Sequence, residues 1–163
     1  MCRVCGEILL SQECQDRGVG LTCVKHTPRT DVSRLENPLV QYWITEAYED
    51  ISTAYFLKRK GNKKLESAFF AHLSVEKTLK ALVAQYTQYR PPKIHNLVEL
   101  TRRANLEINM DQKNFLLMLA AYEIDGRYPE ERQTLLSRTP VHRFDEILEK
   151  ASEMIQWCTQ QIN

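Results

Sequence analysis

The first residues with clear chemical potential lie near the start of the chain, where cysteine and histidine occur in two close pairs. Cys2 and Cys5 form a C-x2-C pair followed by glycine, and Cys23 and His26 form a C-x2-H pair after a spacer of seventeen residues. Each pair can turn tightly around a tetrahedral zinc ion while the spacer closes the site. The spacing predicts a structural zinc site. The alternative is that these side chains are free thiols and a free imidazole.

A second candidate is the pair His72 and Glu76, which lie four positions apart in a segment with helical periodicity. At that spacing the two side chains share one helix face and form a potential acid-base pair. His72 also falls on the apolar stripe of the same helix, and a hydrogen-bonded core histidine is the commoner outcome there. We therefore expect His72 to be buried.

Arg127 is a candidate anion ligand because it lies in a corner between Asp125-Gly126 and Pro129. A guanidinium fixed at a corner can bind a phosphate or a carboxylate of a partner through two hydrogen bonds. It can equally pair with nearby carboxylates as a structural clamp. The chemistry alone leaves both roles open.

Five cations between Lys58 and Lys64 form a further basic cluster. They would suit a phosphate-contacting patch. Cations at a helix C-terminus are also favoured by the helix dipole. The solvated helix end is the favoured interpretation of this cluster.

Helices must position these residues. Asn37-Pro38 marks a helix start, and a long first helix is expected to end near Lys60 before Gly61. The apolar spacing predicts a second helix from 65 to 86, a short one from 96 to 104 and a fourth from Asp111 as N-cap to Gly126. Thr139 and Pro140 open the last helix, which continues to residue 162. The sequence thus predicts an all-α, up-down bundle of four major helices and one short helix over 38–162, preceded by a small irregular cysteine-rich unit over 1–31.

Composition limits the function classes. The chain has 163 residues, of which 43% are hydrophobic, so it can bury one core of ordinary size. The 22 basic and 21 acidic side chains nearly cancel, which argues against nonspecific coating of nucleic acid. No apolar run is long enough to span a bilayer. The first thirty residues lack the basic start and following apolar stretch of a signal peptide. We expect a soluble, cytoplasmic protein, with its five cysteines reduced.

Several motifs in the same order resemble the HEPN domain family (higher eukaryotes and prokaryotes nucleotide-binding domain), in its Arg-Tyr-Pro subgroup. The resemblance covers about residues 38 to 162 and is specific when the motifs are taken together. They are Trp43 with Ala47 and Asp50, Ala68-Phe69-Phe70-Ala71-His72, Glu76-Lys77-Thr78-Leu79-Lys80-Ala81-Leu82, Pro92-Lys93-Ile94-His95-Asn96-Leu97 and Arg127-Tyr128-Pro129.

The resemblance implies a helical bundle that usually forms a homodimer. Many HEPN proteins are metal-independent ribonucleases, often toxins that act beside a minimal nucleotidyltransferase, and others are noncatalytic binders of nucleotides or RNA. The first hypothesis for this chain is a noncatalytic binding module. Its cleft would be lined by Arg127, Tyr128, Lys80 and His95, with no cofactor in the helical domain and a nucleotidyltransferase as partner protein.

The alternative hypothesis is a ribonuclease. In nuclease members an arginine is followed, after four to six residues, by a histidine near the start of the final helix. Here the nearest arrangement is Arg138-Thr-Pro-Val-His142, with three intervening residues. Arg138 and His142 are therefore the candidate catalytic residues if the domain cleaves RNA, and Arg127 with a histidine of the partner chain is a variant of the same hypothesis.

Overall fold

The structure, a computed structural model, describes residues 35–61, 63–124 and 129–162. These residues form six helices and no strand, which confirms the predicted all-α class. The cysteine-rich unit, with Cys2, Cys5, Cys23 and His26, lies outside the described residues. The helices are α2 (Pro38–Gly61), α3 (Lys64–Thr87), α4 (Leu97–Arg103), α5 (Met110–Ile124), α6 (Pro129–Arg138) and α7 (Val141–Thr159).

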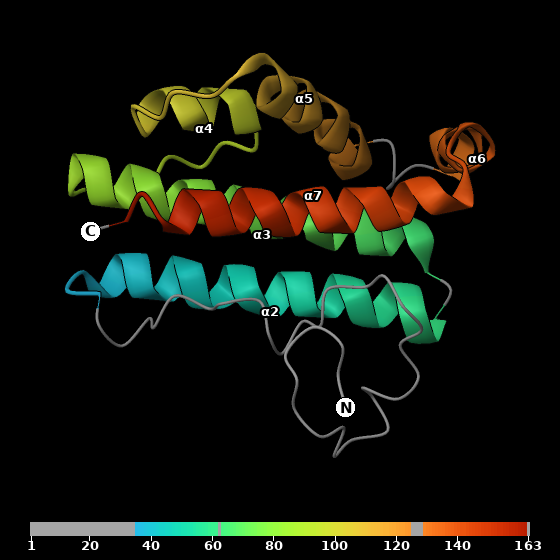
Figure 1. Cartoon of the computed structure of the whole chain (residues 1–163), viewed down its shortest axis with the longest axis horizontal. Coiled ribbons are helices and arrows are strands. Elements are labelled where there is room, and N and C mark those ends of the chain that lie inside the picture. The colour runs from blue at the N-terminus through green and yellow to red at the C-terminus, as the bar shows by residue number, and fades with distance from the viewer. Residues whose placement is uncertain (1–34, 62, 125–128, 163) are drawn as a thin grey trace.

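Helix α3 is the centre of the bundle. It packs against α2, α4, α5 and α7, and the three long helices α2, α3 and α7 lie along the long axis of the domain (Figure 1). Because neighbours surround it, α3 is buried around most of its circumference between Ser74 and Ala84. Polar residues of that stretch are therefore enclosed and must find partners inside the domain.

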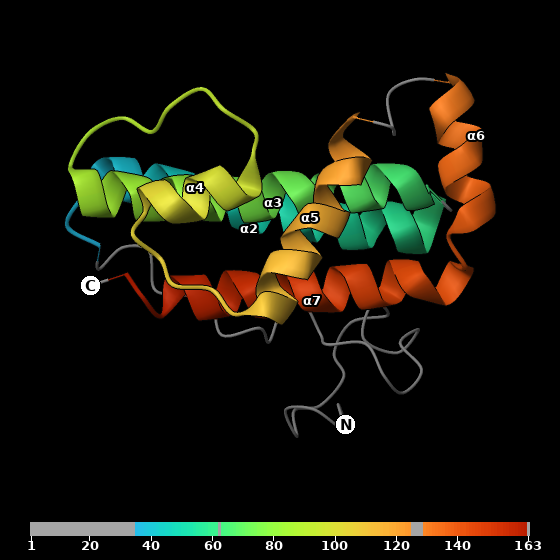
Figure 2. The same ribbon diagram turned by 90° about the horizontal axis from the view of Figure 1, so that it is seen from above.

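The helix directions depart from a simple up-down order. Helices α2 and α3 are antiparallel, as expected for neighbours joined by a short turn, but α7 runs in the same direction as α3 (Figure 1). In Figure 2, α5 crosses over α3 and α7. The chain therefore returns to the end of the bundle where α3 begins before it enters α7. Apolar residues of these helices form one core, with Ile44, Leu79, Leu116, Phe144 and Leu148 among its buried members.

Two side-chain caps fix the helices that cover α3. The Asn96 carboxamide oxygen accepts a hydrogen bond from the Glu99 backbone N–H at 2.9 Å and starts α4. Asn109 accepts from the backbone N–H of Gln112 at 2.8 Å, and the Gln112 side chain accepts in return from the Asn109 N–H at 2.9 Å. This reciprocal pair is a capping box, so Asn109 and not Asp111 is the N-cap of α5.

Helix α6 was not predicted. Its sequence lacks a wide apolar stripe, since only Leu135 packs against the core, and the segment reads as a polar connection between two helices. Figure 2 shows α6 at the end of the bundle. An ion pair between Arg132 and Glu66, with 2.7 Å between Nη2 and Oε1, ties α6 to the start of α3. The last helix begins one residue later than predicted, at Val141, with Pro140 at the N-cap position.

None of the helices in the described ranges combines the length and the apolar character needed to cross a membrane.

Candidate functional site

The carboxylate of Glu76 is the centre of a cluster of ionisable side chains on α3. Glu76 is 3% exposed. The Lys80 ammonium lies 2.7 Å from Oε1, and the His95 Nδ1 atom lies 3.0 Å from Oε2. His72 Nε2 is 3.3 Å from Oε2, but no well-aligned hydrogen bond joins them. Three nitrogen groups therefore converge on one buried carboxylate.

Helical spacing explains two of these contacts. His72, Glu76 and Lys80 follow each other at intervals of four, so they stack along one face of α3. His72 is fully buried, as predicted, but neither ring nitrogen makes the expected hydrogen bond to a described residue. A substrate in solution cannot reach its ring, so an acid-base role for His72 is excluded in this conformation.

The Lys80 ammonium is enclosed from a second side by α2. It lies 5.3 Å from the centroid of the Trp43 ring, within the range of a cation–π contact. The Lys80 side chain is only 8% exposed. A ligand on the surface would therefore be separated from the Lys80 ammonium by the groups that cover it.

His95 is the one member of the cluster that faces solvent. Its side chain is 59% exposed, and it precedes Asn96, the cap of α4. An ionised carboxylate can only accept hydrogen bonds, so the His95 Nδ1 atom carries the hydrogen that Glu76 accepts. Nε2, on the far side of the ring, is left for a ligand or water. The arrangement holds an exposed imidazole in a defined orientation.

The cluster keeps Glu76 charged. Burial alone would raise the pKa of the Glu76 carboxyl, but the contacts with His72, Lys80 and His95 outweigh burial and lower that pKa to about 2. A permanent negative charge in the domain interior is thus balanced by Lys80 and by polarised imidazole groups.

A second ion cluster is centred on Lys77, the residue after Glu76, and joins α3 to α2. The Lys77 ammonium lies 3.0 Å from a carboxylate oxygen of Glu46 and 2.8 Å from one of Asp50. Burial raises the pKa of the Asp50 carboxyl, and Lys77 opposes that change. Together with Trp43 over Lys80, these pairs fix the α2 face against which the Glu76 cluster packs.

The other candidate residues are not gathered around Glu76. Arg127 and Tyr128 lie outside the described residues. Arg138 ends α6, and His142 is the second residue of α7 with a side chain 75% exposed. The His142 Nε2 atom lies 4.0 Å from a Glu146 carboxylate oxygen. In the described parts of the chain, no contact joins Arg138 to His142.

The match to a family model decides the classification. The model of the HEPN domain matches residues 40–162, which is most of the chain. The chain belongs to the HEPN family. No curated protein and no solved structure matches it. The family suggests a function related to nucleotides or RNA.

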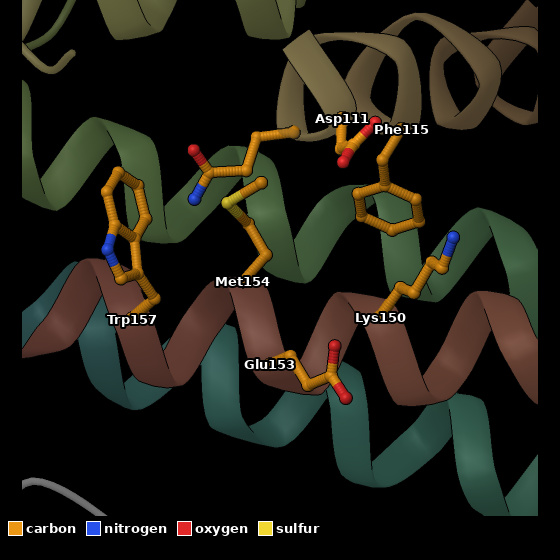
Figure 3. Close-up of a pocket in the computed structure, with 7 residues that line it drawn as sticks. Asp111, Phe115, Lys150, Glu153, Met154 and Trp157 are labelled. Carbon is orange, nitrogen blue, oxygen red and sulfur yellow. The ribbon is translucent and has the colours of Figure 1, made fainter. Parts of the chain in front are cut away.

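A groove of about 270 Å³ opens between α5 and α7 of this HEPN domain, away from the Glu76 cluster. Figure 3 shows Trp157, Met154 and Phe115 along it, with Asp111, Glu153 and Lys150 around them. Two carboxylates and one ammonium disfavour a phosphate ligand there. A hollow of similar volume on α6 is lined by Arg138 together with Glu130 and Glu131, so the same argument applies to it.

Metal ligands are absent from the described part of the HEPN domain: no group of three or more His, Cys, Asp or Glu side chains there is arranged to hold an ion. The predicted zinc ligands lie in the preceding segment.

Sequence reasoning missed the partnership between Glu76 and His95. The two residues are nineteen positions apart, and a loop of irregular structure separates them. Of the contacts that Glu76 makes, only the one with His72, four positions away on the same helix, was singled out from the sequence.

Proposed function

We propose that this HEPN domain binds a nucleotide or RNA without cleaving it, as a homodimer and together with a minimal nucleotidyltransferase as partner protein. Arg127 would contact a phosphate and Tyr128 would stack on a base, since an aromatic ring beside a guanidinium suits both contacts. His95 would contribute its exposed imidazole edge. Lys80 supports the site from inside the domain by holding Glu76.

The observation that carries this proposal is the Glu76 cluster within a domain of the HEPN family. Within the cluster, Glu76 fixes the direction of a single exposed imidazole, His95, and Lys80 in turn holds Glu76. Such preorganisation lowers the entropy lost when a ligand binds. By contrast, the arginine and histidine needed for cleavage are not held together in the described residues.

Equilibrium binding to the Arg127→Ala variant tests this proposal. Fluorescence anisotropy with labelled RNA, and competition by nucleoside triphosphates, would give the affinities of wild type and variant. We expect at least a tenfold loss of affinity, because a bidentate charged contact to a phosphate would disappear. Arg143→Ala is a matched control, since Arg143 is exposed on α7 and pairs with Glu146 at 2.6 Å. Unchanged affinity of the Arg127→Ala variant for every nucleotide and RNA would reject the cleft assignment.

A metal-independent ribonuclease is the second candidate function, and one observation favours it. Arg138 and His142 are both exposed and flank the Thr139-Pro140 junction between α6 and α7. In that mechanism a histidine accepts the proton of the ribose 2′-hydroxyl and an arginine binds the scissile phosphate, which leaves a cyclic or 3′-phosphate end. Cleavage that persists in a His142→Ala variant would remove His142 from the mechanism.

A further inference from the structure

We infer that the loop between α3 and α4, residues 88–96, is a contact surface for single-stranded RNA. This inference rests on the proposed function, because that function supplies the ligand class. It adds the residues of this loop to the proposed site and favours unpaired RNA over a free nucleotide.

Exposed aromatic rings flank the start of the loop. Tyr89 is 78% exposed and Tyr86, in the last turn of α3, is 60% exposed. A ring exposed to this degree gains little from the protein core, so its faces are open for stacking. Bases of single-stranded nucleic acid stack on such side chains irrespective of sequence.

The loop also carries unbalanced positive charge. Residues 88–96 contain Arg90, Lys93 and His95 and no acidic side chain. Arg90 and Lys93 are exposed and have no ion pair with any residue that the structure describes. The nearest acidic residue along the following helix is Glu99, which already binds Arg102 and Arg103. Two cations are therefore free to meet phosphates.

Backbone features fix the course of the loop at its start. Gln88 ends α3 in the left-handed conformation with φ 60°, and its N–H bonds to the Ala84 carbonyl. The Tyr89 N–H donates to the Thr87 hydroxyl oxygen at 3.2 Å. Pro91 and Pro92 then restrict the backbone. Tyr89 and Arg90 are thus presented by a stiff segment.

The end of the loop is anchored to the domain interior. Ile94 packs against the hydrophobic core, and the next residue, His95, holds the buried Glu76 carboxylate at 3.0 Å. Asn96 then caps α4. Since the loop is ordered before a ligand arrives, a ligand that binds across it loses less conformational entropy on binding.

The exposed tyrosine rings and the unpaired cations of the loop together favour single-stranded RNA as the ligand. Stacking on Tyr89 requires an unpaired base, which a duplex does not offer. Arg90 and Lys93 lie three positions apart on the loop, so successive phosphates along a backbone could contact both. A free nucleotide would use only part of this surface.

Fluorescence anisotropy with a short labelled oligouridylate tests the inference on the full chain. We expect Tyr89→Ala to weaken binding at least about fivefold through lost stacking. The double variant Arg90→Gln/Lys93→Gln should reduce the slope of log K against log salt by roughly 1.4, since two phosphate contacts are lost. The control Lys113→Gln/Lys150→Gln removes two exposed cations from α5 and α7 and should change neither quantity. Circular dichroism would confirm that every variant is folded.

Three outcomes overturn the inference, and they separate it from the proposed function. If wild type binds neither RNA nor nucleotides, both fail. If Arg127→Ala loses binding while the loop variants bind as wild type does, the loop assignment fails and the proposed function stands. If an RNA duplex or uridine triphosphate depends on Tyr89 as strongly as the oligouridylate does, the single-strand assignment is wrong.

Discussion

The imidazole of His95 is held by the buried carboxylate of Glu76, with 3.0 Å between Nδ1 and Oε2, across a separation of nineteen residues. This contact connects the interior of the bundle to its surface. Lys80 pairs with Glu76 on the inner side, and His72 lies close to the same carboxylate. A change to Glu76 should therefore affect the stability of the core and the order of the 88–96 loop together.

Acid should destabilise the domain through Glu76. The pKa of its carboxyl is about 2 in the folded state, below its ordinary value of 4.5. A lowered carboxyl pKa contributes stability that is fully present above the ordinary value and is lost as pH falls through the folded value. Glu76 should thus contribute on the order of 3 kcal/mol at neutral pH, lost between about pH 4.5 and pH 2.

Urea unfolding of wild type and Glu76→Gln across that pH range measures this contribution. The variant should be about 3 kcal/mol less stable at pH 7, because it leaves the buried Lys80 ammonium without its counter-ion. The difference should shrink toward pH 2. Glu107→Gln, at an exposed position, is the control and should change stability by less than about 0.5 kcal/mol. A constant difference between Glu76→Gln and wild type at all pH values would contradict the account.

Helix ends were predictable where capping residues and apolar spacing agree. Pro38 and Gly61 bound α2 as predicted, and α4 lies within the predicted range 96–104, with Asn96 as its cap. The start of α5 was misplaced because Asp111 and Asn109 are both good caps, and only the reciprocal bonds with Gln112 distinguish them. Sequence spacing cannot rank two competing caps separated by one turn or less.

The interior role of Lys80 was not predictable from periodicity. The predicted stripe on α3 covers one face, which suits a helix at the edge of a bundle. Helix α3 instead has neighbours on several sides, so Lys80 is enclosed next to Trp43. The tertiary fold decides which helices surround a given helix, and the local sequence pattern does not show this. For the same reason His95 was expected at a cleft but not as the partner of Glu76.

The cap of α5 gives a direct stability test. Asn109→Ala should reduce the free energy of unfolding by about 1 kcal/mol, since the backbone N–H of Gln112 loses its acceptor. Asp111→Ala, in the first turn of the helix, should have a smaller effect. Urea denaturation of both variants compares them, and a larger loss for Asp111→Ala would contradict the assignment.

The thiol of Cys158 should be unreactive in the native protein. Cys158 is fully buried on α7, and burial raises the pKa of its thiol to about 12. At neutral pH the thiolate is therefore scarce and inaccessible. Alkylation followed by peptide mass spectrometry should label Cys158 only after denaturation. Equal labelling rates in the native and denatured protein would show that this part of the core is open.

Zinc is a separate expectation for the N-terminal segment. If Cys2, Cys5, Cys23 and His26 form a structural site, protein purified under reducing conditions should contain one zinc ion per chain by elemental analysis. The double variant Cys5→Ser/Cys23→Ser should lose the metal while the helical content of the HEPN domain is retained. Protein without stoichiometric metal would reject the site and favour free thiols.

A single incubation with bulk cellular RNA in the presence of chelator tests the central claim. The same sample would be run on a native gel for binding and on a denaturing gel for cleavage. The account predicts that wild type shifts the RNA on the native gel and leaves it intact on the denaturing gel, and that Arg127→Ala abolishes the shift. Fragments that disappear with His142→Ala would show that the domain is a ribonuclease, and intact RNA without any shift would contradict the proposed binding function.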